Sequence, residues 1–258
     1  MAISSHLDSS ARRDIRSGGS RPTEQDPDGQ LYRWGGIAGL AGGILMLGAG
    51  LVVGALNLPD ASDPETLIDF ANIESGRIAE HFLYLGALML FALHISVLHR
   101  LLIPAHRPAA LFGTVMAGFG LVILAASSLL HVATSPLADL YAASDTPPED
   151  LAAIEYAWHG AQSVFDTMLA TGVLLVPIGI VLFGVAMRAA PAFGSILTAV
   201  TVGLGSVGTI CAAIAIVDPG SWLSAVSVLA IVAFHMSAGW RTWKLGTEEN
   251  IDITETAA

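Results

Sequence analysis

Apolar residues fill six long stretches of this 258-residue chain, and each stretch holds few charged side chains. They cover residues 31–58, 78–99, 109–134, 163–187, 193–217 and 222–243. An α-helix rises 1.5 Å per residue, so about 20 apolar residues cross the roughly 30 Å hydrocarbon core of a bilayer. The pattern predicts an all-α fold, a polytopic bundle of six transmembrane helices that forms one membrane domain over residues 31–246.

Basic residues fall almost entirely on alternate connections between these stretches. Ten of the 11 Lys and Arg residues lie before or at the start of the first stretch, or at the end of or after an even-numbered one, namely Arg12, Arg13, Arg16, Arg21, Arg33, Arg100, Arg107, Arg188, Arg241 and Lys244. Only Arg77 falls on the opposite side. Because Lys and Arg are retained in cytoplasmic connections, the distribution predicts a multi-pass plasma-membrane protein with both termini in the cytoplasm.

Composition supports a membrane protein and argues against nucleic acid as a partner. Hydrophobic residues make up 53% and charged residues 13%, against about a quarter charged in soluble domains. The formal charge of -11 argues against nucleic acid, which requires a basic patch. Cys211 is the single cysteine, so no intrachain disulfide and no cysteine metal site can form. The excess of arginine over lysine, with abundant alanine and glycine, points to a GC-rich bacterial genome.

The segments outside the six stretches are polar. Residues 1–30 and 247–258 have the composition of disordered cytoplasmic tails. In the first exterior connection, Asp63 and Pro64 form a helix start before Leu67 and Phe70, which predicts a short amphipathic helix on the outer surface. In the second, the helix that contains the fourth stretch is expected to begin near Pro147.

Ionisable residues near the outer boundary are the first candidates for a functional site. At 1.5 Å per residue, His81 lies about 28 Å above Arg100 and His131 about 36 Å above Arg107. Asp166 reaches a similar depth on a helix that also carries His159, and Glu80 is the neighbour of His81 in the sequence. A cavity lined by His81, His131, His159, Asp166 and Glu80 could pass protons, bind a small ligand or hold a metal such as zinc. The alternative is that these side chains are simply solvated at the interface.

A second pair of histidines lies near the cytoplasmic side. His94 and His235 each precede an arginine by six residues, and facing imidazoles at equal depth can ligate haem iron. The spacing of 13 between His81 and His94, however, turns the second ring by about 220° at 100° per residue. Stacked haems on one helix are therefore disfavoured, and no cofactor is expected.

The chain resembles bacterial six-span integral membrane proteins known only as a domain of unknown function. The resemblance rests on the start Arg33-Trp34-Gly35-Gly36-Ile37-Ala38-Gly39, the acidic exterior connection, and an arginine followed closely by proline after even-numbered stretches. It covers about residues 31–246. It implies a fold and no activity.

Three classes of function fit the sequence, in which no catalytic motif stands out. The first is a transport, sensing or accessory protein with the outer polar cavity. The second is a metal- or haem-binding membrane enzyme or redox protein. The third is a structural protein that packs against a copy of itself or another membrane protein through glycine-rich faces such as Gly35, Gly39 and Gly43.

Overall fold

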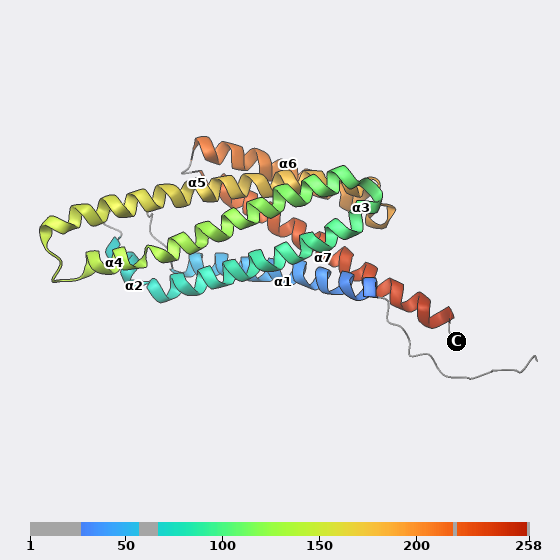
Figure 1. Ribbon diagram of the computed structural model, residues 1–258, viewed down its shortest axis with the longest axis horizontal. Helices are drawn as coiled ribbons and strands as arrows, with labels where there is room; N and C mark the ends of the chain where they lie inside the picture. The colour runs from blue at the N-terminus through green and yellow to red at the C-terminus, as the bar shows by residue number, and fades with distance from the viewer. Residues whose placement is uncertain (1–26, 57–66, 219–220, 257–258) are drawn as a thin grey trace, which may run out of the picture.

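The computed structural model describes residues 27–56, 67–218 and 221–256, and every regular element within these ranges is helical (Figure 1). The elements are α1 (Pro27–Leu56), α2 (Leu67–Asn72), α3 (Glu74–Ala133), α4 (Ser135–Ala142), α5 (Pro148–Met187), the 3-10 turn η2 (Pro191–Phe193), α6 (Gly194–Val217) and α7 (Leu223–Thr256). The long helices lie roughly along one direction and form a bundle. The predicted all-α bundle is confirmed.

Five helical segments of the described chain are long and apolar enough to cross a membrane, as expected of a multi-pass membrane protein. The predicted stretches 78–99 and 109–134 form the two arms of α3, which are separated by a kink within its 60 residues. The other predicted stretches coincide with α1, the second half of α5, α6 and the first part of α7.

Helix α3 bends back on itself at His106, whose backbone leaves helical geometry (φ −154°, ψ 80°). Pro104 and Pro108 flank the bend, and proline removes a backbone donor and disfavours helix for the residue before it. The Nδ1 atom of His106 accepts the Ala109 N–H and starts the second arm. Figure 1 shows the two arms of α3 running back beside each other. We call the end of the bundle at this bend the hinge end.

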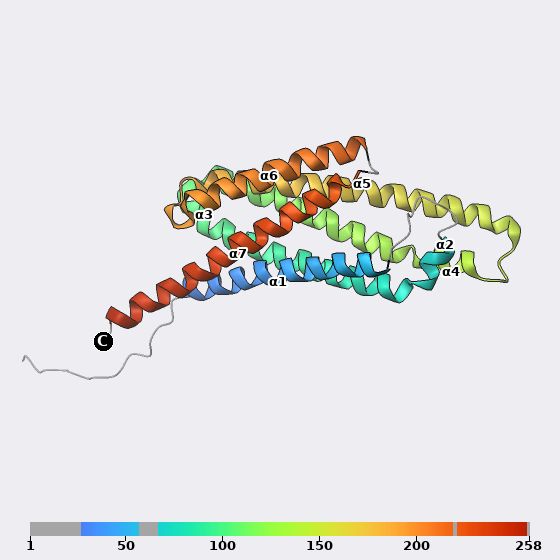
Figure 2. The ribbon, with the colours of Figure 1, turned by 180° about the vertical axis from the view of Figure 1, so that it is seen from behind.

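Small residues allow close helix packing in the bundle. The main neighbours of α3 are α1 and α5, while α7 packs between α1 and α6 (Figure 2). A Cβ atom on Gly36 of α1 would lie 2.4 Å from the Trp243 backbone nitrogen of α7. The same holds between α3 and α5, where a Cβ on Gly179 would lie 2.7 Å from the Ala117 backbone nitrogen. These glycines therefore let backbones touch within one chain.

The opposite end of the bundle carries α2 and α4 and is called here the α4 end (Figure 1). The predicted short helix is present as α2, but its apolar side faces protein. Leu67 and Phe70 are buried against Ala138 of α4 and Trp158 of α5, and these four residues are called here the α4-end cluster. Helix α5 begins at Pro148, as predicted, and its first turns cover this small cluster. The Asp63-Pro64 helix start lies outside the described residues.

The helices at the hinge end extend beyond the predicted boundaries of the membrane domain. Helix α1 starts at Pro27, where Asp28 pairs with Arg100 of α3 at 2.7 Å, although the predicted tail reached residue 30. Helix α7 continues to Thr256, through most of the segment predicted as a second tail. An ion pair of 3.3 Å joins Arg241 to Glu248, two turns later on the same helix. The expectation for residues 1–26 lies outside the described residues.

Candidate functional site

Two predicted site residues, His81 and His131, meet between the arms of α3 near the α4 end. The Nε2 atom of His81 lies 3.0 Å from the Nδ1 atom of His131. The bend at His106 is 25 residues from each of them (106 − 81 and 131 − 106), so equal arm lengths bring them to the same level. Both side chains are buried, each at 9% exposure.

The neighbours of His81 determine where the protons of this pair lie. The Nδ1 atom of His81 is 2.9 Å from the Arg77 carbonyl oxygen and also contacts the Glu80 carboxylate. Both partners are acceptors, so Nδ1 of His81 carries the hydrogen and donates it. In a neutral ring the Nε2 atom of His81 is then an acceptor, and the Nδ1 atom of His131 must donate to it. This leaves Nε2 of His131 as an acceptor, buried and without a hydrogen-bond partner among the described residues.

Arg77, the exception in the basic pattern, is buried beside this pair at 2% exposure. It donates through Nη2 to the His131 carbonyl at 3.2 Å. Its guanidinium lies over the ring of Phe70, 4.4 Å from the centroid, and 5.9 Å from that of Trp158. Contacts of this kind stabilise a desolvated cation. Its electrostatic neighbours are the carboxylates Glu74, Glu80 and Asp139. Arg77 therefore holds the α4-end cluster onto α3 and balances the charge next to the histidines.

A cavity of about 310 Å³ opens beside the histidine pair. Its wall is made by Val53, Glu80, His81, Tyr84, Ser127, Ser128, His131, Phe165 and Leu169. Carbon atoms form most of this wall, although six of the nine residues carry a polar group. Phe165 packs on His131, with ring centroids 4.4 Å apart. The cavity thus combines an apolar interior with polar groups that α3 holds in place.

The other predicted outer residues, His159 and Asp166 of α5, do not line this cavity. Asp166 is exposed and accepts a hydrogen bond from Gln162 at 3.0 Å, while His159 is half-buried. Helix α5 instead presents Phe165 and Leu169 to the cavity. No group of three His, Cys, Asp or Glu side chains in the described ranges could hold a metal ion.

The second histidine pair lies deeper in the bundle, between α3 and α7. The Nδ1 atoms of His94 and His235 are 2.9 Å apart, and both side chains are fully buried. Phe91 stacks on His235 at 3.8 Å, and Gly39 of α1 closes the site, because a Cβ there would lie 2.9 Å from His94 Nδ1. The imidazoles bond directly to each other, so this arrangement leaves no place for a porphyrin between them. The Nε2 atoms of both rings lack a partner among the described residues.

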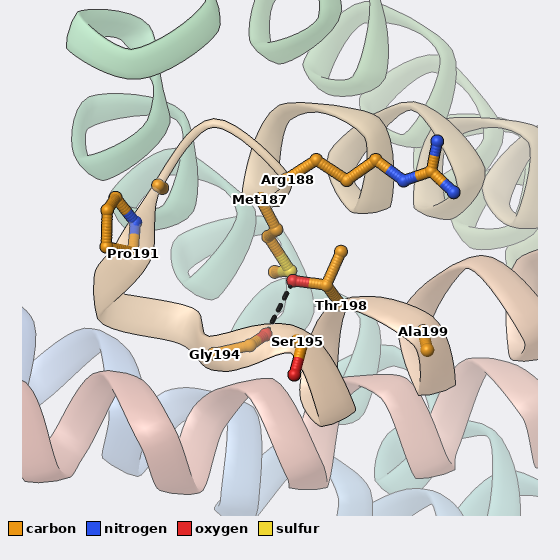
Figure 3. Close-up of a pocket in the computed structure, with 8 residues that line it drawn as sticks. Met187, Arg188, Pro191, Gly194, Ser195, Thr198 and Ala199 are labelled. Atoms are coloured by element: carbon orange, nitrogen blue, oxygen red, sulfur yellow. Dashed lines mark hydrogen bonds between the residues drawn. The ribbon is translucent and has the colours of Figure 1, made fainter.

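A larger hollow, of about 440 Å³, lies at the hinge end where α5 turns into α6 (Figure 3). Arg188 and Pro191 line it together with the first turn of α6. The Thr198 hydroxyl donates to the Gly194 carbonyl at 2.8 Å, and the Arg188 guanidinium is directed away from both residues. Because no charged group converges on a point inside it, we assign the candidate site to the cavity beside His81 and His131.

Several residues of the site were not predicted from the sequence. Tyr84, Ser127 and Ser128 line the cavity, and Arg77 supports it, but only their depth near His81 and His131 could have indicated this. Comparison with known proteins adds no further constraint: no family model, curated protein or solved structure matches this chain.

Proposed function

We propose that this chain is a bacterial plasma-membrane protein that crosses the bilayer six times and binds a small ligand in a cavity near the outer face, as a transport or sensing protein does. Each arm of α3 counts as one crossing, which adds one to the five apolar helical segments. The hinge end, which carries Arg100, Arg107 and Arg188, then faces the cytoplasm, and so do both termini.

The burial of Arg77 supports this orientation. In the sequence Arg77 is the one basic residue on the outer side. An exposed Arg77 would weaken the excess of basic residues on the cytoplasmic side. In the fold its guanidinium lies over Phe70 and near Trp158, and the carboxylates of Glu74, Glu80 and Asp139 act on it electrostatically. All the remaining basic residues lie in segments assigned to the cytoplasmic side.

The length of α5 agrees with an extension outside the membrane. Its 40 residues correspond to about 60 Å, roughly twice the hydrocarbon thickness. Its first turns pack with α2 and α4 and include acidic and exposed residues, while its second half is buried in the bundle. The cavity at Phe165 and Leu169 then lies near the outer boundary of the bilayer.

The observation that carries the functional proposal is the cavity beside the His81–His131 pair. Ionisable side chains inside a membrane protein are costly and usually face a cavity or one another, and here they do both. A concave, largely apolar space with a few placed polar groups is the usual form of a small-molecule site. The metal and haem alternatives receive less support, because no three ligand side chains converge in the described ranges and His94 and His235 bond to each other.

The structural-partner alternative receives mixed support from the glycines. Gly35, Gly36, Gly39 and Gly43 are in close contact with other helices of the same chain. Other glycines of the described residues are open, because a Cβ there would meet nothing within 4 Å: Gly48, Gly50, Gly54, Gly118, Gly160, Gly194 and Gly203. An open glycine face alone identifies no partner, so the ligand cavity is preferred.

Cysteine labelling of intact cells tests both orientation and cavity. In a Cys211→Ser background, three single variants are compared: Tyr156→Cys, which is 79% exposed on the outer part of α5, Arg107→Cys at the hinge, and Leu169→Cys in the cavity. We expect a membrane-impermeant thiol reagent to label Tyr156→Cys in intact cells and Arg107→Cys only after lysis. A small charged thiosulfonate should reach Leu169→Cys from outside, more slowly than Tyr156→Cys.

Two results contradict the proposal in different parts. Labelling of Arg107→Cys but not Tyr156→Cys in intact cells reverses the orientation. Failure of the small reagent to reach Leu169→Cys from outside, with Tyr156→Cys labelled normally, means that no outer-facing ligand cavity exists. Buried Leu98→Cys, at 0% exposure, serves as the control for an unreactive core position.

A further inference from the structure

A groove of about 540 Å³ lies between α4 and the first turns of α5, and it shares no residue with the cavity beside His81 and His131. We propose that this groove is a docking surface for a basic segment of a partner protein, which places an apolar side chain in the groove and Lys or Arg side chains beside Asp145 and Asp150. The wall of this α4–α5 groove consists of Leu137, Leu140, Ala143, Asp145, Thr146, Pro147, Asp150, Ala153, Ile154 and Ala157.

Apolar side chains from two helices form most of the α4–α5 groove. Leu137 and Leu140 line it from α4, and Ala153 and Ile154 line it from α5. The other side of α4 is already covered, because Ala138 is buried in the α4-end cluster. Leu140, in contrast, is 53% exposed. The groove is therefore the side of α4 that the described chain leaves open, and its volume lies within the roughly 300–1,000 Å³ that is usual for binding sites.

The α4–α5 groove faces water rather than lipid. Residues 139–155 carry five carboxylates, a charge density that the hydrocarbon core does not tolerate. Helix α5 is about 60 Å long, roughly twice the thickness of that core, so its first turns project beyond it. Figure 1 shows the connection between α4 and α5 at the end of the molecule opposite the bend of α3. An apolar surface in water gains free energy when a partner covers it, whereas one that faces acyl chains does not.

The charge at the turn between α4 and α5 determines the sign of the partner. Asp145, Glu149 and Asp150 are exposed there. Residues 108–187 contain no Lys or Arg, and no ion pair within the described ranges includes Asp145 or Asp150. The N-terminus of α5 contributes about half a positive elementary charge, which is less than the charge of these three carboxylates. This end of the groove is therefore negative, and it attracts a basic segment and repels an acidic one.

The basic segment comes from a partner and not from a second copy of this chain. At the α4 end the described residues include one arginine, Arg77, and its side chain is 2% exposed. The exposed basic residues Arg100, Arg107 and Arg188 lie at the hinge end, and the arginines that precede α1 join the bundle there as well. Two copies that meet at their α4 ends would therefore bring like charges together. A metal ion alone would leave the apolar wall uncovered.

Fluorescence anisotropy tests the proposal with the full chain in nanodiscs of zwitterionic lipid and with labelled peptides, the signal of empty nanodiscs being subtracted. The first peptide is Gly-Lys-Leu-Lys-Lys-Leu-Lys-Gly. The second has glutamate in place of every lysine, and the third has serine in place of every leucine. We expect the first peptide to bind at least tenfold more tightly than either of the others, and to bind more weakly as salt is added.

Matched variants locate the binding in the α4–α5 groove. Asp145→Asn combined with Asp150→Asn should weaken binding of the first peptide about fivefold, the effect of two exposed ion pairs. Asp69→Asn combined with Asp166→Asn removes the same charge outside the groove and should have a smaller effect. Ala153→Trp fills the groove and should abolish binding. Ala152→Trp, at an exposed neighbouring position outside the groove wall, should not.

The results that overturn the docking surface are independent of the ligand cavity. If the unmodified chain binds none of the peptides, or binds the glutamate peptide as tightly as the lysine peptide, the proposal is wrong. It is also wrong if Ala153→Trp and Ala152→Trp bind the first peptide equally well, because the peptide then lies elsewhere. None of these results changes the labelling of Leu169→Cys, so the two proposals fail separately. The comparison of peptides on the unmodified chain does not depend on whether any variant folds.

Discussion

Replacement of Gly36 by alanine should separate α1 from α7, because the added methyl group meets backbone atoms rather than a movable side chain. A Cβ on Gly36 would lie 2.4 Å from the Trp243 nitrogen and 2.6 Å from both the Gly239 carbonyl oxygen and the Trp243 Cα. Gly50 lies on the same helix, and a Cβ there would meet nothing within 4 Å. The two substitutions make the same chemical change in opposite environments.

The size of the effect follows from these distances. Non-bonded carbon atoms pack at about 3.5–4.0 Å, so the helices must move apart by about 1 Å at Gly36. A gap of that size forfeits a quarter to a half of the dispersion attraction of the atoms on each side. Overpacked sites typically lose about 1–3 kcal/mol. Alanine is the better helix former by up to about 1 kcal/mol, and Gly50→Ala measures that gain alone.

Unfolding in mixed micelles with increasing SDS, followed by circular dichroism, measures the difference. We expect Gly36→Ala to lower the free energy of unfolding by about 1–3 kcal/mol relative to the unmodified chain. Gly50→Ala should leave it unchanged or raise it slightly. If the two variants unfold at the same SDS fraction, the close α1–α7 contact does not exist in the membrane protein and the argument from backbone contact fails.

Two further substitutions test the buried polar pair and the α4-end cluster. His94→Leu and His235→Leu should each lower the free energy of unfolding in the same SDS assay. The double variant should lose about 1–3 kcal/mol less than the sum of the two single losses, because it leaves no unpaired Nδ1 atom. Additive losses would show that the pair is not coupled. Trp158→Ala should lower the stability of the α4-end cluster by about 3–5 kcal/mol. Proteolysis between α4 and α5, at residues 143–147, should then become faster. Unchanged cleavage would mean that Trp158 does not hold α2 and α4 in place.

Much of the fold could be predicted because the apolar pattern is set by bilayer thickness. The two stretches that form the arms of α3, the short helix α2 and the start of α5 near Pro147 all correspond to sequence signals. The apolar pattern predicted the arms of α3 as separate spans, and in the fold a kink between Pro104 and Pro108 separates them. A single residue in non-helical geometry, His106, is enough to reverse the chain.

The candidate site was harder to predict, because the sequence indicates how deep a residue lies in the membrane better than it indicates which way its side of the helix faces. His81 and His131 were expected at one depth, and the fold brings them into contact. Asp166 was expected to face the cavity, yet the adjacent Phe165 does, because a helix turns 100° per residue and both sides of α5 are stable near a wet boundary. Nothing in the sequence indicates that Arg77 is buried, since its aromatic neighbours Phe70 and Trp158 come from other elements.

The position of the bend at His106 also determines which residues of the two arms meet at the site. Because His81 and His131 meet at equal distances from it, one extra residue between positions 107 and 113 would raise the second arm by about 1.5 Å and rotate it by about 100°. His131 would then turn out of the cavity, and Gly113 and Gly120 would leave their places against α5. The length of this short segment is thus as constrained as the identity of the histidines, and evolution can change it only in steps that restore the helical phase.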